Sequence, residues 1–146
     1  MKKIPADVSE LKKAFHQHLK AHRSITGLSS YLLLFYAAEC GLKSIYLSEH
    51  NLQTTEDFPD SIKNHGHKLD RWCKELKINA SQLTFKTQTN NKLIPSFHLA
   101  CGGSSRNIVA AHQVWRYGIT IKKEDEEDLI EWLDQLCNWI KENISR

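Results

Sequence analysis

The chain has 146 residues and a formal net charge of +3 at pH 7 with its eight histidines neutral. Hydrophobic residues make up 40% of it and charged residues 25%, which is ordinary for a globular protein and excludes a largely disordered chain. The mild positive charge permits contact with a polyanion without requiring it, because dedicated nucleic-acid binders are usually more basic. We expect residues 1–146 to form a single domain.

Hydrophobic periodicity predicts two helices near the start of the chain and one at its end. From Asp7 to about His22, apolar residues recur at helical spacing with lysines opposite them, so an amphipathic helix is expected. Leu28–Leu47 is apolar on nearly every side. Its charged residues, and the lack of a second such segment, favour the buried central helix of a bundle over a membrane span. After Ile121, acidic first turns followed by an apolar stripe predict the last helix.

Two further helices are expected between these. The segment GHKLDRWCKELK at 66–77 places its apolar residues on one stripe. Ser104 or Ser105 can cap another helix, which would have Arg106 in its first turn and would end near Gly118.

The remaining segments are predicted to connect these helices. Glu49–His65 is polar and contains Pro59, so it is expected to be a loop. The segment 78–103 resists a regular helix, and irregular segments of this length are often functional. Within it we expect a short buried turn at 93–100 and, at most, short strands in 84–89. The fold class that follows is all-α, a single up-and-down helical bundle of about five helices.

The four cysteines, Cys40, Cys73, Cys101 and Cys137, contain no C-x-x-C pair, and three of them lie in apolar helical patterns. This usage indicates free thiols in a reducing compartment and neither a disulfide framework nor a zinc site. The N-terminus has basic residues with no apolar run behind them, so a secretory signal is not expected. A cytoplasmic protein without membrane contact is therefore predicted.

The segment SSRNIVAAHQVWRYG at 104–118 gathers the residues best suited to chemistry. His112 can act as a general acid or base near neutral pH. Arg106 and Arg116 are permanent cations suited to a phosphate. His112 and Arg116 are four residues apart and share a helix face, whereas Arg106 lies about 120° away around an ideal helix. The spacing is therefore compatible with a joint site without forcing one, and each residue could equally be structural.

Two other positions could serve such a site. Glu39 and Lys43 lie four apart on the central helix, where the simplest interpretation is an intrahelical ion pair. The alternative is that Glu39 reaches a site formed with other helices. His67 could either stabilise the turn before its helix or line the site.

No metal site or cofactor is expected. His18 and His22 lie four apart on a helix, but no further ligand at a suitable spacing completes a metal site, so a solvated helix face is the simpler interpretation. There is no glycine-rich phosphate loop. The four tryptophans lie mostly on apolar stripes, which indicates core positions and not base-stacking platforms.

Three stretches together resemble the HEPN superfamily of small helical domains. AAECGLKSIYL at 37–47 is similar to the family's second-helix pattern, GHKLDRWCKEL at 66–76 to its Gly-His-x-Leu helix entry, and RNIVAAH at 106–112 to its R-x4–6-H motif. They occur in the family's order, and the resemblance covers roughly residues 7–144. It implies a metal-independent endoribonuclease, the toxin or effector of a toxin–antitoxin or antiphage defence system. The implied partners are an RNA substrate, a second copy of the chain and a cognate antitoxin or regulatory protein.

The same resemblance implies roles for individual residues. His112 would move protons while a ribose 2′-OH attacks the adjacent phosphate, and Arg106 would stabilise the charge that develops on that phosphate. Asn107 would orient the substrate or the histidine.

Arg116, Tyr117, Glu39 and His67 are candidate supporting residues. The chain departs from one toxin pattern, R-x4-H-x-Y, because Val114 stands where the tyrosine would be. The alternative function is a non-catalytic HEPN-like module that binds a nucleotide, RNA or another protein.

Overall fold

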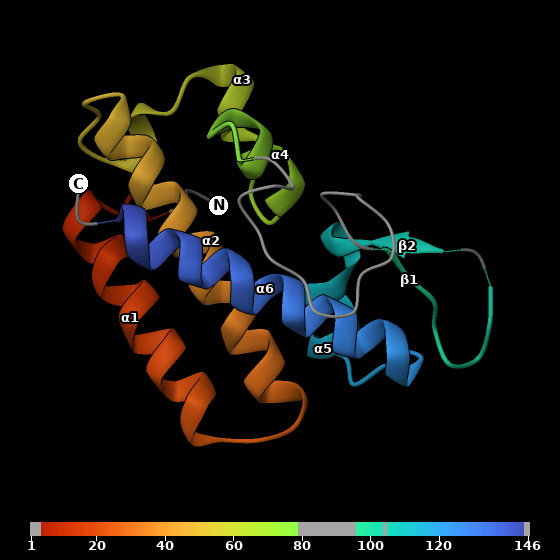
Figure 1. Ribbon diagram of the computed structural model, residues 1–146. Coiled ribbons are helices and arrows are strands. Elements are labelled where there is room, and N and C mark those ends of the chain that lie inside the picture. Colours follow the sequence, from red (N-terminus) through yellow and green to blue (C-terminus); the bar gives the residue numbers. More distant parts are fainter. Residues whose placement is uncertain (1–3, 79–95, 104, 145–146) are drawn as a thin grey trace.

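The computed structural model of the protein describes residues 4–78, 96–103 and 105–144 (Figure 1). Helices dominate the described part of the chain, which confirms the predicted all-α class. The helices are α1 (Val8–Ser24), α2 (Leu28–Glu49), α3 (Asp60–Lys63), α4 (Leu69–Glu75), α5 (Ala111–Arg116) and α6 (Lys123–Asn143), with the 3-10 turns η1 (Thr55–Asp57) and η3 (Ile108–Ala110). Two short strands, β1 (Ser96–Phe97) and β2 (Arg106–Asn107), pair with each other.

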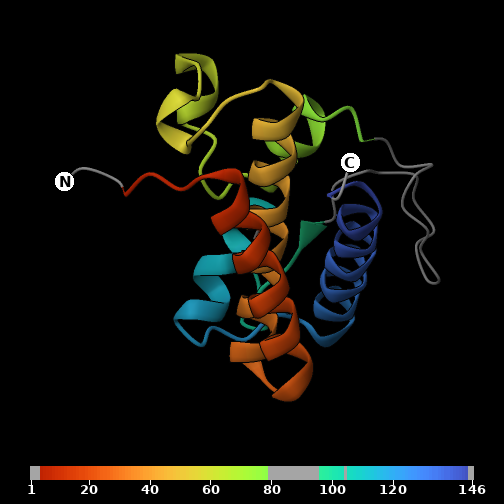
Figure 2. The same ribbon diagram turned by 90° about the vertical axis from the view of Figure 1, so that its left-hand side faces the viewer.

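The N-terminal helix α1 begins where its local sequence predicts. Asp7 and Glu10 form a capping box, in which the Glu10 backbone N–H donates to Asp7 Oδ1 at 2.7 Å and the Asp7 N–H donates to Glu10 Oε1 at 3.0 Å. The buried face of α1 carries Leu11, Phe15 and Leu19, four residues apart in turn. The predicted amphipathic helix is therefore confirmed, and it packs antiparallel against α2 (Figures 1 and 2).

The prediction of a buried central helix is confirmed in α2. This helix packs against α1, α4, α5 and α6, and α6 crosses it beside α1 (Figures 1 and 2). In the described ranges, no helix is long and apolar enough to cross a membrane. The helices approach closely at Gly41, where an added Cβ would lie 2.5 Å from Ile140 Cγ2 and 3.0 Å from Phe15 Cδ1. A glycine in the middle of α2 thus allows α1 and α6 to pack tightly against it.

The segment between α2 and α4 was predicted to be a loop, and that prediction is wrong in part because the segment contains the 3-10 turn η1 and the short helix α3. Thr54 and Asp57 form a capping box that begins η1. Pro59 occupies the position before α3, where its fixed φ suits the start of a helix. Ile62 of α3 is buried in the core. Pro59, which indicated a loop, instead starts a short helix.

The helix predicted over 66–77 is present but shorter, because α4 spans Leu69–Glu75. Gly66 has φ +48°, in the left-handed region that favours glycine, so the chain turns there before the helix begins. The turn is fixed by Trp72, whose Nε1 donates to the Gly66 carbonyl at 3.1 Å. His67 therefore lies in a turn that a buried tryptophan holds in place.

The helix start predicted at Ser104 or Ser105 is wrong. Asn107 is the capping residue, because its Oδ1 accepts the Val109 backbone N–H at 3.0 Å and begins η3. Arg106 consequently lies in β2, paired antiparallel with Phe97 of β1. A short buried turn was expected at 93–100, and the strand β1 within it corrects that expectation. The expected burial is present at Phe97, which is fully buried. Residues 79–95, including the possible strands in 84–89, lie outside the described residues.

The C-terminal part follows the prediction closely. α5 ends at Arg116 and is followed by Gly118 with φ +68°, as expected for a glycine that stops a helix. α6 has acidic residues in its first turn, and its predicted inward stripe is buried, namely Leu129, Leu133, Leu136 and Ile140. Three of the tryptophans, Trp72, Trp115 and Trp132, are also buried in the core, and Trp139 packs against it.

The cysteines are all free thiols. Burial raises the pKa of the Cys40 thiol to about 11 and that of Cys73 to about 12. Cys73 and Cys137 are buried and Cys40 is half-buried, each on a helix, whereas Cys101 is exposed outside the helices.

Candidate functional site

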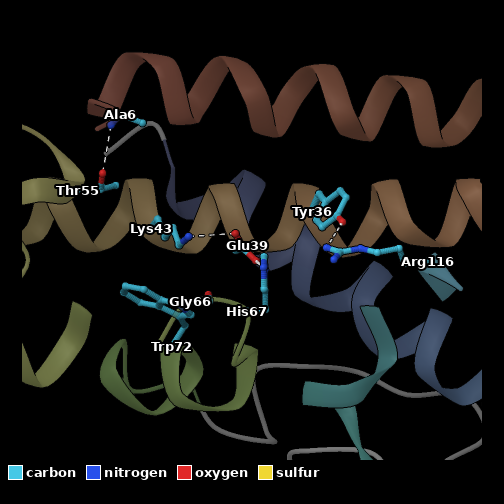
Figure 3. Close-up of polar contacts among 9 residues, drawn as sticks. All are labelled: Ala6, Tyr36, Glu39, Lys43, Thr55, Gly66, His67, Trp72 and Arg116. Atoms are coloured by element: carbon cyan, nitrogen blue, oxygen red, sulfur yellow. Dashed lines mark hydrogen bonds and ion pairs between the residues drawn. The ribbon is translucent and has the colours of Figure 1, made fainter. Parts of the chain in front are cut away.

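Three acid–base side chains from separate parts of the chain meet in one place. Glu39 comes from α2, His67 from the turn before α4, and His112 from α5. His67 Nδ1 is hydrogen-bonded to Glu39 Oε1, and the rings of His67 and His112 lie 4.4 Å apart between centroids with an interplanar angle of 37°. We call these three residues the acid–base cluster. Figure 3 shows Glu39 and His67 pointing toward each other from α2 and the neighbouring turn.

Glu39 is held as a carboxylate although it is only 8% exposed. Burial by itself would raise the pKa of Glu39, but the hydrogen bond from His67 and the charge of Lys43 outweigh it, so the pKa is lowered. Lys43 Nζ lies 3.0 Å from Glu39 Oε2 (Figure 3). The predicted intrahelical ion pair is present on one carboxylate oxygen, and the other oxygen reaches a second segment; the functional role of Glu39 stays a prediction.

The hydrogen bonds of the two histidines indicate which ring nitrogen carries a proton. A carboxylate can only accept, so His67 Nδ1 donates to Glu39. A carbonyl can likewise only accept, so His112 Nδ1 donates to the Val109 oxygen, 3.0 Å away. In the neutral form of each ring, Nε2 is then the basic nitrogen.

The two imidazoles differ in their surroundings. The His112 residue is only 7% exposed, and Phe35 lies against it with 5.3 Å between ring centroids. Burial lowers the pKa of His112, and the neighbouring His67 lowers it further. The His67 side chain, in contrast, is 44% exposed. One ring is therefore kept neutral in the interior while the other faces solvent.

A cation lies beside this cluster, and it is Arg116. Arg116 Nη2 donates to the Tyr36 hydroxyl at 3.0 Å (Figure 3), and the Tyr36 ring lies 6.4 Å from that of His67 between centroids. The charge of Arg116 also contributes to the lowered pKa of His112. This electrostatic effect shows that Arg116 lies near His112, as their four-residue spacing predicts. Tyr117, the next residue, is 68% exposed.

The structure does not join Arg106 to this cluster. The Arg106 side chain is exposed on β2, and within the described residues no ion pair, hydrogen bond or ring contact links it to Glu39, His67 or His112. The charges that act on the His112 pKa come from His67, Arg116 and Glu39. The side-chain oxygen of Asn107 is occupied in capping η3. The catalytic role predicted for Arg106 and the orienting role predicted for Asn107 stay predictions.

Sequence reasoning missed Tyr36 and Phe35, which both lie on the apolar central helix. The available signal was spacing, since Tyr36 stands three residues before Glu39 and thus shares its helix face. A tyrosine in an apolar run is more often a core residue, so this signal alone is weak.

Other histidines bond within one helix, as His50 Nδ1 does with the Tyr46 carbonyl, or between two elements. His22 Nδ1 lies 2.8 Å from both the Ser30 carbonyl and the Ser30 hydroxyl, which links α1 to α2. Among the residues that the structure places, no group of three His, Cys, Asp or Glu side chains is arranged to hold a metal ion.

Comparison of the chain with models of known protein families, with curated proteins and with solved structures finds no significant match. The resemblance to the HEPN superfamily therefore rests on the three sequence motifs. Two of those motifs supply Glu39 and His67, and the third supplies His112.

Proposed function

We propose that the protein is a metal-independent endoribonuclease whose proton transfers are carried out by the acid–base cluster. The observation that carries the proposal is the pair of imidazoles 4.4 Å apart, one bound to a carboxylate and the other held neutral by burial. An acid and a base held side by side at one site are what general acid–base catalysis requires.

The roles follow from those surroundings. His112, neutral and with a basic Nε2, accepts the proton of a ribose 2′-OH. The 2′ oxygen then attacks the adjacent phosphorus, and the bond from phosphorus to the 5′ oxygen breaks. The doubly protonated form of His67, whose Nδ1 donates to Glu39, gives the proton on its Nε2 to that 5′ oxygen. The products are a 2′,3′-cyclic phosphate and a 5′-hydroxyl end, and no metal is needed.

Arg116 is the cation best placed to contact the phosphate. It is exposed, it lies one helical turn after His112, and the Tyr36 hydroxyl orients its guanidinium. Arg106 is retained as a candidate phosphate ligand on the strength of the R-x4–6-H motif alone.

The test is cleavage of end-labelled RNA in the presence of EDTA, with the product ends identified by mass. His67→Ala and His112→Ala are expected to reduce the rate by about 10²–10⁴-fold. His16→Ala is the matched control, because His16 is exposed on α1. Urea unfolding of each variant separates lost chemistry from lost folding. If folded His112→Ala cleaves RNA as fast as the parent, the proposed role of the cluster is wrong.

The biological role that we propose is an effector of a toxin–antitoxin or antiphage defence system, active as a homodimer in the cytoplasm. Free thiols favour a reducing compartment. Induced expression of the parent should slow growth, whereas His112→Ala should not, and co-expression of a cognate antitoxin should restore growth. Mass measured in solution tests the dimer separately.

One observation favours a second candidate function, a non-catalytic module that binds RNA, a nucleotide or a protein. His112 is 7% exposed, so a substrate oxygen must enter a nearly closed space to reach it. For such a module, the parent would bind RNA with no cleavage at any pH and would leave host growth unchanged.

A further inference from the structure

The helix α1 carries charge of one sign along most of its length. From residue 11 to residue 24 it contains four lysine and arginine side chains and no aspartate or glutamate. The four are Lys12, Lys13, Lys20 and Arg23. No carboxylate of the described residues lies within ion-pair distance of them. Opposite charges three or four residues apart stabilise a helix and like charges destabilise it, so a merely solvated face usually mixes both signs. The cations of α1 are therefore free to meet a partner.

The acidic residues are gathered elsewhere in the molecule. The segment 124–134 of α6 holds seven carboxylates and no lysine or arginine. In Figure 2, α5 lies on one side of the pair α1 and α2, and α6 lies on the other. The net charge of +3 thus conceals a separation between a basic helix and an acidic one. A polyanion is attracted to the first and repelled by the second.

The side chain of Tyr36 connects α1 to the acid–base cluster. The His18 ring of α1 lies 6.2 Å from the Tyr36 ring between centroids, and the His67 ring lies 6.4 Å from it. The Tyr36 hydroxyl accepts the hydrogen bond from Arg116 Nη2 (Figure 3). Tyr36 and His18 are only half-buried, so part of each ring faces solvent. A continuous surface therefore runs from Arg116 over Tyr36 to α1.

The outward face of α1 extends this surface. Lys13, Gln17 and Lys20 are exposed, and their spacing of four and then three residues places them on one helix face. We call these three residues the basic stripe. At 100° per residue, His18 lies between the basic stripe and the buried face of α1. Lysine ammonium groups on an exposed face bind phosphates as point charges, and an amide such as that of Gln17 can also bond a phosphate oxygen.

We propose that the basic stripe binds backbone phosphates of a single-stranded RNA whose strand passes from Arg116 over Tyr36 and His18 onto α1. The identification of that strand as the substrate rests on the proposed function. A helix with its side chains is only about 10–12 Å wide, so the strand must bend around its edge. A duplex cannot follow that curve, because its persistence length is about 150 base pairs. Phosphate contacts position a strand without reading its bases, so the basic stripe adds affinity without sequence preference.

The first experiment measures binding apart from cleavage. Fluorescence anisotropy with a 2′-O-methyl oligoribonucleotide, which 2′-OH attack cannot cleave, gives the affinity as a function of salt concentration. Each phosphate contact on a single strand contributes a slope of about −0.7 in log K against log salt. The double variant Lys13→Ala/Lys20→Ala should therefore reduce the slope by about 1.4 and weaken binding about 25-fold at roughly 0.1 M salt. The matched control Lys123→Ala/Lys141→Ala removes the same charge from exposed positions on α6 and should leave the slope unchanged.

The second experiment uses the length of the substrate. A dinucleotide bound at Arg116 is too short to reach the basic stripe, so the double variant Lys13→Ala/Lys20→Ala should cleave it at the parent's rate. For a longer strand, KM should rise about 25-fold with kcat unchanged. The reason is that contacts remote from the reacting phosphate bind the ground state and the transition state equally.

The outcomes separate this proposal from the proposed function. If Lys13→Ala/Lys20→Ala weakens RNA binding but the parent cleaves no RNA, the basic stripe stands as a binding surface and the proposed function fails. If RNA is cleaved while that variant and the α6 control bind the long strand equally well, the basic stripe is overturned. Binding of polyglutamate as tight as that of RNA would overturn the assignment to nucleic acid, and equal binding of a duplex would overturn the path around α1. Urea midpoints show that each variant is folded.

Discussion

Replacing Gly41 by alanine at the centre of α2 has two opposing effects on the stability of the protein. Alanine is favoured over glycine in a helix interior by about 1 kcal/mol, so an exposed site would gain stability. Here the new Cβ would lie 2.5 Å from Ile140 Cγ2 and 3.0 Å from Phe15 Cδ1. Ile140 Cγ2 is attached to a branched Cβ and cannot move away without a change of χ1 rotamer. Overpacking costs about 1–3 kcal/mol, and we expect the upper part of that range.

The expected net result is therefore a loss of about 1–2 kcal/mol in the free energy of unfolding. For a chain of this length, that loss lowers the melting temperature by about 3–7 °C. Urea unfolding followed by far-UV circular dichroism measures it, since a change in midpoint at constant slope reports stability.

A double-mutant cycle tests the cause. Ile140→Ala alone should cost about 2–5 kcal/mol, because it leaves a cavity in the core. In that background the methyl group at position 41 meets no Cγ2, so Gly41→Ala should become neutral or slightly stabilising. The reasoning is refuted if Gly41→Ala stabilises the parent, or if it costs the same in both backgrounds.

Three further outcomes follow from the charges and thiols. Glu39→Gln should lower the free energy of unfolding by about 1–3 kcal/mol at pH 7, because the hydrogen bonds from Lys43 and His67 lose their carboxylate acceptor. The pKa of Glu39 is lowered on folding, so its contribution to stability is present above pH 4.5 and is lost as the pH falls through the folded pKa. Urea unfolding should therefore show a larger difference in free energy of unfolding between the parent and Glu39→Gln at pH 7 than at a pH below the folded pKa. The pKa of His112 is lowered on folding, so the unfolded chain binds more protons and the free energy of unfolding should fall as the pH drops below 6.5. Urea unfolding should show a smaller fall in His112→Asn than in the parent. Alkylation at mildly alkaline pH should modify the exposed Cys101 first, because burial raises the pKa of Cys40 to about 11 and that of Cys73 to about 12; mass spectrometry before and after addition of urea should count one fast thiol and then four.

The helices that build the core could be predicted because their signals are local. α1 and α6 are long enough for apolar periodicity to repeat several times, and their buried residues fall on the expected stripes, while α2 is recognised by an apolar run on nearly every side. Short elements carry no such repetition. α3 was missed because four residues cannot show a helical period, and Pro59 indicates a loop as readily as a helix start.

The start of the helix before His112 shows a different limit. Serine and asparagine cap helices about equally well, so residue type alone does not distinguish the predicted Ser104 and Ser105 from Asn107, which caps the turn in the structure. Pairing of Arg106 with Phe97 decided between them, and that contact joins residues nine apart across a segment without periodicity. A prediction from local sequence has no access to this pairing, and it therefore placed Arg106 on the wrong kind of element.

The acid–base cluster could be predicted only in part for the same reason. Glu39 and His67 are 28 residues apart, and His112 is farther still along the chain. Periodicity places each residue on its own helix or turn but does not say which faces meet. The ordered motifs indicated these three residues as candidates. The left-handed turn at Gly66 is the feature that aims His67 at α2, and the glycine alone does not reveal its direction.

The position of Arg106 leads to one more prediction. In its own chain Arg106 is exposed on β2, and in the described ranges it is not bonded to the acid–base cluster. If this arginine takes part in cleavage, we expect it to act on the cluster of a second copy, because a homodimer can bring two exposed surfaces together. Mixed Arg106→Ala and His112→Ala proteins should then recover part of the parent's rate of RNA cleavage, since a mixed dimer holds one site with both residues intact. Arg116→Ala, whose guanidinium already lies beside its own cluster, should complement His112→Ala poorly. Recovery in neither mixture, with Arg106→Ala as active as the parent, would remove Arg106 from the site and leave Arg116 as its phosphate ligand.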